Sequence, residues 1–117
     1  LPLVQHGMQI LMDFYHQDIL SLETIVQKTS HNVANRFQVK ERGYIREGYY
    51  ADLAVLDIDK PYTVSNDNIL YKCGWSPFNG HTFQSSIFMT IVNGNIAFTD
   101  GQVVEDLPFG MQIEFDR

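Results

Sequence analysis

The chain has 117 residues, of which 44% are hydrophobic and 19% are charged, and its formal net charge is −6 at pH 7. These values fit one soluble domain or part of one, and the negative charge argues against nucleic acid as a partner. An apolar run of 18 residues that would span a membrane is absent from the sequence. The single Cys73 excludes an internal disulfide, and the opening residues do not form a signal-peptide pattern, so we expect a cytoplasmic protein.

Two helices are predicted in residues 1–37. The first runs from about 3 to 16, where apolar residues recur at spacings of three and four, as on a helix with one buried face. The residues of this stripe are Val4, Met8, Leu11, Met12 and Tyr15. The second helix begins with Ser21 as its N-cap and ends near Phe37, with a break at Asn32, which could cap a further short turn.

After Gly43 the hydrophobic period changes from 3.6 to 2, which predicts a β region. The segment "ADLAVLDI" (51–58) has apolar side chains on both faces of a strand, so we expect both faces to be covered. The segment "PYTV" (61–64) is a candidate for a short strand. Residues 87–99 are predicted to form a hairpin, because Asn93-Gly94 accepts the positive φ angles of a two-residue type I′ turn. Residues 103–117 are interpreted as a tail that crosses the surface.

The four histidines are not predicted to form a catalytic or metal site. His6 and His16 are ten residues apart on one helix, so they cannot form the one-turn pair of a zinc site. His31 lies beside Asn32 at the predicted helix break, where a polar capping role is sufficient. His81, in "FNGHTFQ", has no acidic residue or cysteine near it in the sequence and is interpreted as a hydrogen-bonding surface residue.

Two roles are considered for Cys73, in "YKCGWSPF": a catalytic nucleophile and a small buried hydrophobic residue. The neighbouring Lys72 would favour a thiolate, but the surrounding residues match no cysteine-enzyme signature, so we favour the buried residue. Asp52, Asp57 and Asp59 alternate along a predicted strand and do not form a converging pair of carboxylates. We therefore predict no catalytic, cofactor-binding or metal-binding residue in this chain.

The stretch "GYIREGYYADLAVLDID" resembles a sequence that is common in the metal-dependent amidohydrolase superfamily. In that pattern Gly43 and Gly48 would allow a tight reversal, Ile45 would anchor it in a core, and Asp52 would accept hydrogen bonds from turn amides. Three further segments narrow the resemblance to the dihydroorotases: "LPLVQHG", "SLETIVQKTSHNVANRF" and "LYKCGWSPFNGHTFQSSIFMTIVNGNIAF". The tract "KCGWSPFNG" distinguishes this family from the hydantoinases and dihydropyrimidinases.

The resemblance implies an α/β parent protein, in which a TIM-type barrel is joined to a small β domain built from both chain termini. Residues 1–37 would be the terminal helices of the barrel, and residues 38–117 the C-terminal part of the small β domain. In the family, one or two zinc ions are bound by a His-x-His pair, a carboxylated lysine, further histidines and an aspartate. All of these motifs precede the segment that corresponds to Leu1. We therefore expect zinc in the parent and none in this chain, which opens on a predicted helix without a methionine.

The implied activity of the parent is the reversible interconversion of N-carbamoyl-L-aspartate and dihydroorotate in pyrimidine biosynthesis, by zinc-activated hydrolysis of a cyclic amide. The chain alone would be inactive. Its expected partners are the remaining N-terminal part of the same enzyme, further copies in a homo-oligomer and, in the parent, a small-molecule substrate. The alternatives are another cyclic amidase of hydantoinase or allantoinase type, an inactive dihydroorotase-like subunit, and a free-standing β module for binding or assembly.

Overall fold

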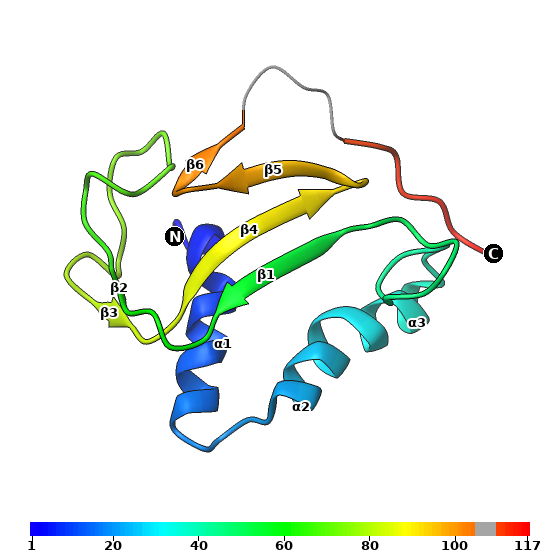
Figure 1. Ribbon diagram of the computed structural model, residues 1–117, viewed down its shortest axis with the longest axis horizontal. Helices are drawn as coiled ribbons and strands as arrows, with labels where there is room; N and C mark the ends of the chain where they lie inside the picture. Colours follow the sequence, from blue (N-terminus) through cyan, green and yellow to red (C-terminus); the bar gives the residue numbers. More distant parts are fainter. Residues whose placement is uncertain (105–109) are drawn as a thin grey trace. The chain divides into compact units, whose positions relative to one another are not determined.

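The computed structural model describes residues 1–104 and 110–117, which divide into two compact units (Figure 1). The first unit contains Leu1–Leu20 and Leu56–Ile87, and the second contains Ser21–Val55 and Phe88–Arg117. Each unit therefore joins two stretches that are far apart in the sequence. The predicted division at residue 37 concerns the domains of a parent protein and stays a prediction. Within the described residues, none of the helices has the length and apolar character needed to cross a membrane.

The first unit combines one helix with a two-stranded sheet. The helix begins with a 3-10 turn, η1 (Val4–His6), and continues as α1 (Gly7–His16), which confirms the helix predicted over residues 3–16. Strand β2 (Tyr62–Thr63) pairs antiparallel with β3 (Thr82–Phe83), and Tyr62 lies opposite Phe83. The short strand predicted at 61–64 is therefore confirmed.

The buried face of this helix differs from the predicted apolar stripe. His6, Gln9 and Met12 are buried, whereas Val4 is 91% exposed. His6 is the last residue of η1, and Gln9 and Met12 follow it at a spacing of three in α1. Gln9 is satisfied there, since its Nε2 donates to the carbonyl of Ser85 at 3.2 Å. Met12 is thus the one residue of the predicted stripe that is fully buried.

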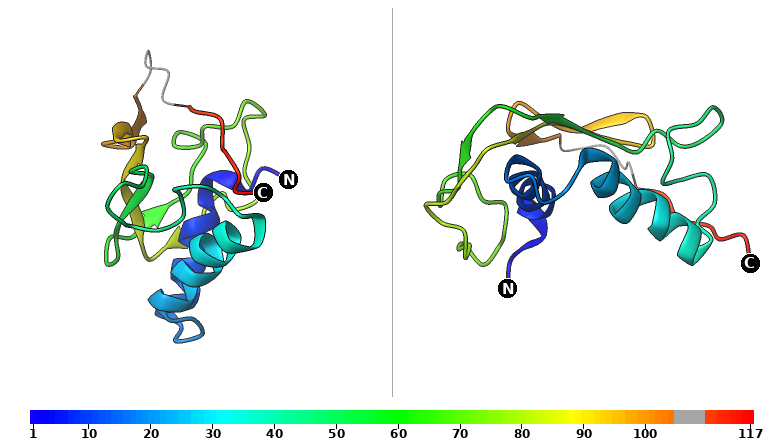
Figure 2. Two further views of the ribbon diagram at one scale, coloured as in Figure 1. Left: turned by 90° about the vertical axis from the view of Figure 1, so that its right-hand side faces the viewer. Right: turned by 90° about the horizontal axis from the view of Figure 1, so that it is seen from below.

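The second unit contains a longer helical segment made of three successive parts, which Figure 2 shows as one continuous helix. These parts are α2 (Leu22–Val26), a π-helical turn η2 (Gln27–His31) and α3 (Asn32–Phe37). The predicted start is confirmed, because Ser21 Oγ accepts a hydrogen bond from the amide of Thr24 at 3.1 Å. The predicted end near Phe37 is also confirmed, since Gln38 adopts a left-handed conformation with φ of 55°.

The predicted break at Asn32 is wrong. The amide of Asn32 bonds to the carbonyl of Gln27, five residues earlier, so the helix passes through this position with a π-type hydrogen bond. Thr29 also keeps its side chain within the helix, since its Oγ1 donates to the carbonyl of Ile25 at 2.7 Å. Local polar side chains therefore widen the helix here and do not end it.

A four-stranded sheet has the order β1-β4-β5-β6 (Figure 1). Its strands are β1 (Leu53–Asp57), β4 (Ser86–Val92), β5 (Asn95–Thr99) and β6 (Gln102–Val103). The predicted hairpin is confirmed, because β4 pairs antiparallel with β5 and Val92 lies opposite Asn95. The two turn residues have the positive φ angles of a type I′ turn, 51° at Asn93 and 81° at Gly94.

Strand β1 lies at one edge of this sheet, and the prediction that both of its faces are covered is wrong. Ala54 is exposed, Val55 is 38% exposed, and none of the residues Leu53–Asp57 is buried. The C-terminal segment lies beside residues 38–40, because the amide of Lys40 donates to Glu114 at 2.9 Å and that of Asp116 to Gln38 at 2.8 Å. The part of the predicted tail at 105–109 is outside the described residues.

Candidate functional site

The glycine-containing turn that begins at Gly43 lies directly against the helix of the second unit. Gly43 has φ of 86°, and a Cβ atom there would be 2.5 Å from Ala34 Cβ and 3.0 Å from the carbonyl oxygen of Ser30. The first distance is shorter than real Cβ contacts and the second is unusually short, so glycine is the residue that fits here without a shift of the turn or the helix. Gly48 has a similar φ of 83° but nothing within 4 Å of a Cβ atom. The first glycine is therefore required for both contact and conformation, and the second for conformation alone.

Tyr44 is the side chain that fixes this turn to the helix. Its ring stacks on His31 with centroids 4.0 Å apart and an interplanar angle of 6°, and its hydroxyl accepts from Asn35 Nδ2 at 2.8 Å. The guanidinium of Arg46 lies over the Tyr44 ring at 4.0 Å, within the range of a cation–π contact. The predicted anchor, Ile45, is 88% exposed, so that prediction is wrong. His31, predicted as a capping residue, acts here through its aromatic face.

Asp52 joins the end of this turn to the distant hairpin. Its Oδ1 accepts from the amide of Asn93 at 2.9 Å, and its Oδ2 pairs with Arg42 Nη1. Arg42 Nη1 also donates to Asn93 Oδ1 at 2.9 Å, and the amide of Gly94 donates to the carbonyl of Ala51 at 3.0 Å. Arg42, Asp52 and Asn93 are named below the Asp52 cluster. Asp52 does bind a turn amide, as expected, but that amide is 41 residues away in the hairpin.

The two charged side chains of the Asp52 cluster, Arg42 and Asp52, form an ion pair with each other. The side chain of Arg42 is 11% exposed and that of Asp52 is 33% exposed. The guanidinium of Arg42 also lies 4.1 Å from the centroid of the Tyr50 ring. A carboxylate that pairs with a guanidinium and also accepts a backbone N–H has both oxygens engaged in contacts that join segments of the chain.

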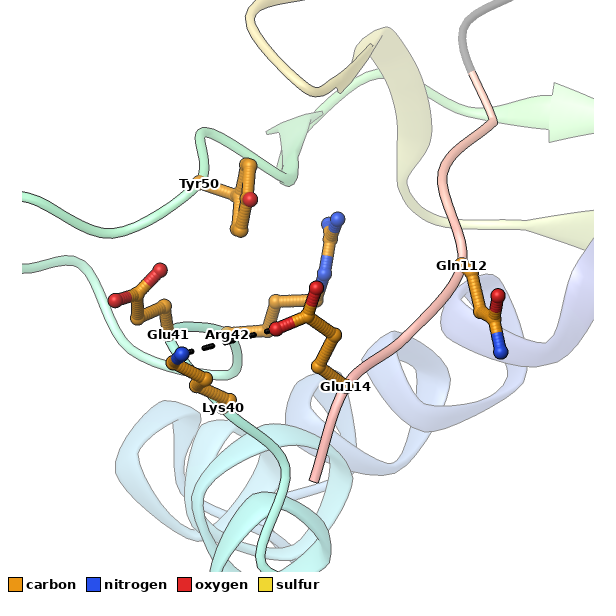
Figure 3. A pocket seen from close by; sticks show the side chains of 6 residues that line it. All are labelled: Lys40, Glu41, Arg42, Tyr50, Gln112 and Glu114. Carbon is orange, nitrogen blue, oxygen red and sulfur yellow. Dashed lines mark ion pairs between the residues drawn. The ribbon is translucent and has the colours of Figure 1, made fainter. Parts of the chain in front are cut away.

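A small polar pocket lies beside this cluster (Figure 3). It is lined by Lys40, Glu41, Arg42, Tyr50, Gln112 and Glu114. Across it, Lys40 Nζ is 3.7 Å from Glu114 Oε2, and both side chains are well exposed. The cavity volume is about 10 Å³, which is about enough for one water molecule. The pocket is therefore too small to bind an organic substrate.

In the first unit, His16 and Ser85 form a pair that resembles a base and a nucleophile. His16 Nε2 lies 2.8 Å from the carbonyl oxygen of Ile58 and 3.0 Å from Ser85 Oγ. Because a carbonyl oxygen only accepts, Nε2 must carry the proton of this imidazole. Ser85 Oγ in turn donates to the same carbonyl at 2.6 Å and is fully buried. This pair therefore ties the helix to the chain at Ile58 and cannot activate the serine.

A second polar link in the same unit connects Asp13 to the segment around β3. Asp13 Oδ2 is 3.1 Å from His81 Nε2, and its Oδ1 accepts from the amide of Gln84 at 3.0 Å. The side chain of His81 is 47% exposed, which agrees with the prediction of a hydrogen-bonding surface residue. The partner was not predictable from neighbouring residues, because Asp13 and His81 are 68 positions apart.

Sequence reasoning missed the environment of His6. This side chain is fully buried, and burial lowers the pKa of its imidazole below the ordinary value of 6.5. The ring of Phe83 stacks on it with centroids 5.6 Å apart. Burial also raises the pKa of the neighbouring Tyr62 above 10.0. The only sequence signal for this site is the interruption of the apolar stripe by "QH" at the helix start.

Cys73 does not occupy the buried position that was predicted for it. The thiol is exposed, and the nearby Trp75 is 47% exposed. Gly74 has φ of 73° in a turn, which carries both neighbours to the surface.

Over residues 1–104 and 110–117, no group of three or more His, Cys, Asp or Glu side chains gathers to hold a metal ion. The described residues therefore do not fit the zinc centre that the resemblance implies for the parent.

Comparison with known proteins connects these observations to one family. Residues 9–98 match the model of a family described as the amidohydrolase family. Dihydroorotase from Pyrococcus abyssi is 33% identical over 104 residues, which is 89% of this chain and 26% of the relative. Allantoinase from Desulfitobacterium hafniense is 34% identical over 104 residues, which is 89% of this chain and 23% of the relative. The chain thus spans about a quarter of the length of these curated relatives.

A solved structure gives the same result for the fold. L-Hydantoinase (dihydropyrimidinase) from Arthrobacter aurescens matches with a TM-score of 0.73 and 28% sequence identity, over 85% of this chain and 22% of that chain. This match confirms the predicted fold class, helices followed by a small β sheet of an α/β amidohydrolase. The resemblance to dihydroorotases is confirmed by the sequence relatives. Because the family match extends over most of the sequence, the chain belongs to the amidohydrolase family.

Proposed function

We propose that the chain is the C-terminal portion of a dihydroorotase, an enzyme that interconverts N-carbamoyl-L-aspartate and dihydroorotate. The observation that carries this proposal is the similarity to dihydroorotase from Pyrococcus abyssi along nearly the whole chain. The tract "KCGWSPFNG", at residues 72–80, supports the same substrate, since hydantoinases and dihydropyrimidinases usually differ from dihydroorotases in this part of the resemblance. The described residues themselves supply structural links and leave the chemistry to the rest of the enzyme.

A second candidate is a cyclic amidase that acts on allantoin or a hydantoin. The similarity to an allantoinase is of the same size as that to a dihydroorotase, and the structural match is to a hydantoinase. All three substrates are cyclic compounds that contain an amide or ureide bond, so one catalytic centre could serve each of them with a different binding pocket. The two candidates therefore differ in substrate and agree in reaction class.

The partner that we propose for this chain is the remaining N-terminal part of the same enzyme, which would contain the zinc site and bind the substrate. Apolar side chains that are largely exposed, such as Val4 and Ile45, support this proposal. Strand β1 at the edge of its sheet offers backbone groups to a further strand. The cytoplasm is the compartment in which we propose that the enzyme works.

The test uses the enzyme from the complete gene and compares three substrates at one enzyme concentration. We expect kcat/KM for dihydroorotate to exceed that for allantoin and hydantoin by about 100-fold or more, because a pocket that hydrogen-bonds one substrate rejects analogues lacking those groups. A preference for allantoin or hydantoin would favour the second candidate. The 117-residue chain alone serves as the control and should show no turnover and no stoichiometric zinc. One tightly bound zinc per isolated chain would contradict the proposed location of the metal.

A further inference from the structure

His6 occupies an enclosed site in the first unit that the proposed function does not use. Its side chain is 0% exposed, and neither ring nitrogen has a hydrogen-bond partner among residues 1–104 and 110–117. Four aromatic rings surround it, with centroid distances of 5.6 to 6.4 Å. They belong to Tyr62, Tyr71, Phe78 and Phe83, and are named below the aromatic cage. A buried polar group without a partner is rare in folded proteins and requires an explanation.

The hydroxyl groups of the cage are directed elsewhere. Tyr62 Oη donates to the carbonyl of Asn68 at 3.2 Å. Tyr71 Oη accepts from the amide of Gln5 at 2.8 Å, and Gln5 Nε2 donates to the same Asn68 carbonyl at 2.9 Å. These bonds hold the loop around residues 68–71 against the start of the helix. They close the cage around His6 without offering a partner to either ring nitrogen.

Within residues 1–104 and 110–117, His6 forms no ion pair with an acidic side chain. On its own helix, Asp13 is bonded to His81 and to the amide of Gln84. The ring of His81 contacts Phe83, with centroids 4.5 Å apart, on the β3 side of the cage. From β2 and the 68–71 loop, the titratable groups in ring contact with His6 are Tyr62 and Tyr71, with centroids 6.1 and 6.4 Å away. A proton on His81 would therefore add a like charge near His6.

The contacts with the cage would stabilise a protonated imidazole only weakly compared with the hydration that it loses on burial. The ring of Phe83 is stacked on the imidazole at 25°, that of Tyr62 is tilted at 46°, and those of Tyr71 and Phe78 stand at 73° and 77°. Contacts between a cation and aromatic rings are weak compared with the loss of the entire hydration shell. Desolvation accordingly dominates, and it lowers the pKa of His6.

We propose that His6 makes the first unit acid-sensitive: the unit is closed while the imidazole is neutral, and it opens when the imidazole takes up a proton and must reach water. This inference rests on the enclosed ring, on its two unpartnered nitrogens, and on the lack of an ion pair to His6 among the described residues. The device concerns the fold of this chain and is independent of the substrate of the enzyme.

The sign of the effect follows from proton linkage. The pKa of His6 lies below 6.5 in the folded chain, so the opened form binds the proton more readily. Above about pH 6.5 both forms are neutral at this residue, and it adds no pH dependence. As the pH falls below about 6.5, the equilibrium constant for opening should rise by up to about tenfold per pH unit, the limit for one proton. The increase stops below the folded-state pKa.

The experiment measures amide hydrogen exchange of the full chain between about pH 7.5 and about pH 4.5, corrected for the intrinsic exchange rate. His6→Phe keeps an aromatic ring in the cage and removes the titrating group. As the pH falls below about 6.5, we expect the opening constant for amides in Leu56–Ile87 to rise in the wild type by up to about tenfold per pH unit. This rise should be absent in His6→Phe. His31→Phe is the matched control in the second unit, and His81→Gln removes the other imidazole near the cage. Both should follow the wild type.

Two outcomes would overturn the proposal. Equal pH dependence of the opening constant in the wild type and in His6→Phe would show that His6 is not the sensor. Loss of the pH dependence in His81→Gln would assign the effect to the pair of Asp13 and His81. If His6→Phe does not fold, the imidazole resonances of the wild type decide the question. The His6 ring should remain neutral in the closed unit below pH 6.5, and a ring that protonates near pH 6.5 while the unit stays closed would contradict the proposal.

Discussion

Gly43→Ala should destabilise the second unit far more than the same change at Gly48. Both glycines have positive φ angles, 86° and 83°, so each alanine variant carries a conformational penalty of about 1–2 kcal/mol. At Gly43 the new methyl group would also lie 2.5 Å from Ala34 Cβ and 3.0 Å from the Ser30 carbonyl oxygen. Neither contact atom is the end of a flexible side chain, so the turn or the helix must shift.

The additional penalty at Gly43 is that of overpacking a close contact, about 1–3 kcal/mol. Gly43→Ala should therefore cost about 3 kcal/mol in total, and Gly48→Ala, which has nothing within 4 Å, about 1–2 kcal/mol. Urea unfolding followed by circular dichroism gives both free energies by linear extrapolation. Equal costs at the two glycines would refute the close contact between the turn and the helix.

A double-mutant cycle with Ala34→Gly separates the contact from the conformational penalty. Ala34→Gly alone should cost about 1 kcal/mol, because glycine is a poor helix former. In that background the methyl group at Gly43 meets only the Ser30 carbonyl, so Gly43→Ala should cost about 1 kcal/mol less than in the wild type. Strictly additive effects would mean that these two positions do not touch.

Three further predictions concern the hairpin, the Asp52 cluster and the exposed apolar surface. Gly94→Val should cost about 1–3 kcal/mol, because φ of 81° strains a β-branched residue, whereas Gly110→Val, in open space, should change the unfolding midpoint little. Asp52→Asn should cost about 2 kcal/mol, since it leaves the 11% exposed Arg42 without its charged partner. Asp57→Asn, on the exposed side of β1, is its control and should stay within about 0.5 kcal/mol of the wild type. The isolated 117-residue chain should self-associate in sedimentation over a dilution series, or bind the N-terminal portion supplied separately; a monomer at micromolar concentration that ignores this portion would favour a free-standing module.

Local sequence signals predicted the elements whose conformation depends on a few neighbouring residues. Asn93-Gly94 specifies its turn because both residues tolerate positive φ, and Ser21 caps its helix because its side chain reaches an amide three positions later. The glycine pattern also indicated a turn whose first position, Gly43, admits no side chain. The hairpin turn and the helix cap could be predicted because each is decided within one turn or one helix end, whereas the contact that excludes a side chain at Gly43 comes from Ser30 and Ala34 and was not predicted.

Burial was predicted less well, because it depends on partners that are distant in the sequence. At the helix start His6 is buried and Val4 is exposed, which the spacing of apolar residues alone does not reveal. Cys73 is exposed because its turn lies at the surface, although free cysteine is usually buried. Asp13 and His81 are in contact although they are 68 positions apart, and local sequence patterns do not predict contacts over such a separation.

The glycine motif, taken with the structure, explains why this part of the chain identifies a family more readily than a substrate. Position 43 requires glycine because the turn touches the helix there. Asp52 accepts a hydrogen bond from the hairpin amide of Asn93. Both requirements come from backbone geometry, which every enzyme with this arrangement must meet whatever cyclic amide it hydrolyses. Dihydroorotases and allantoinases therefore resemble the chain to a similar degree.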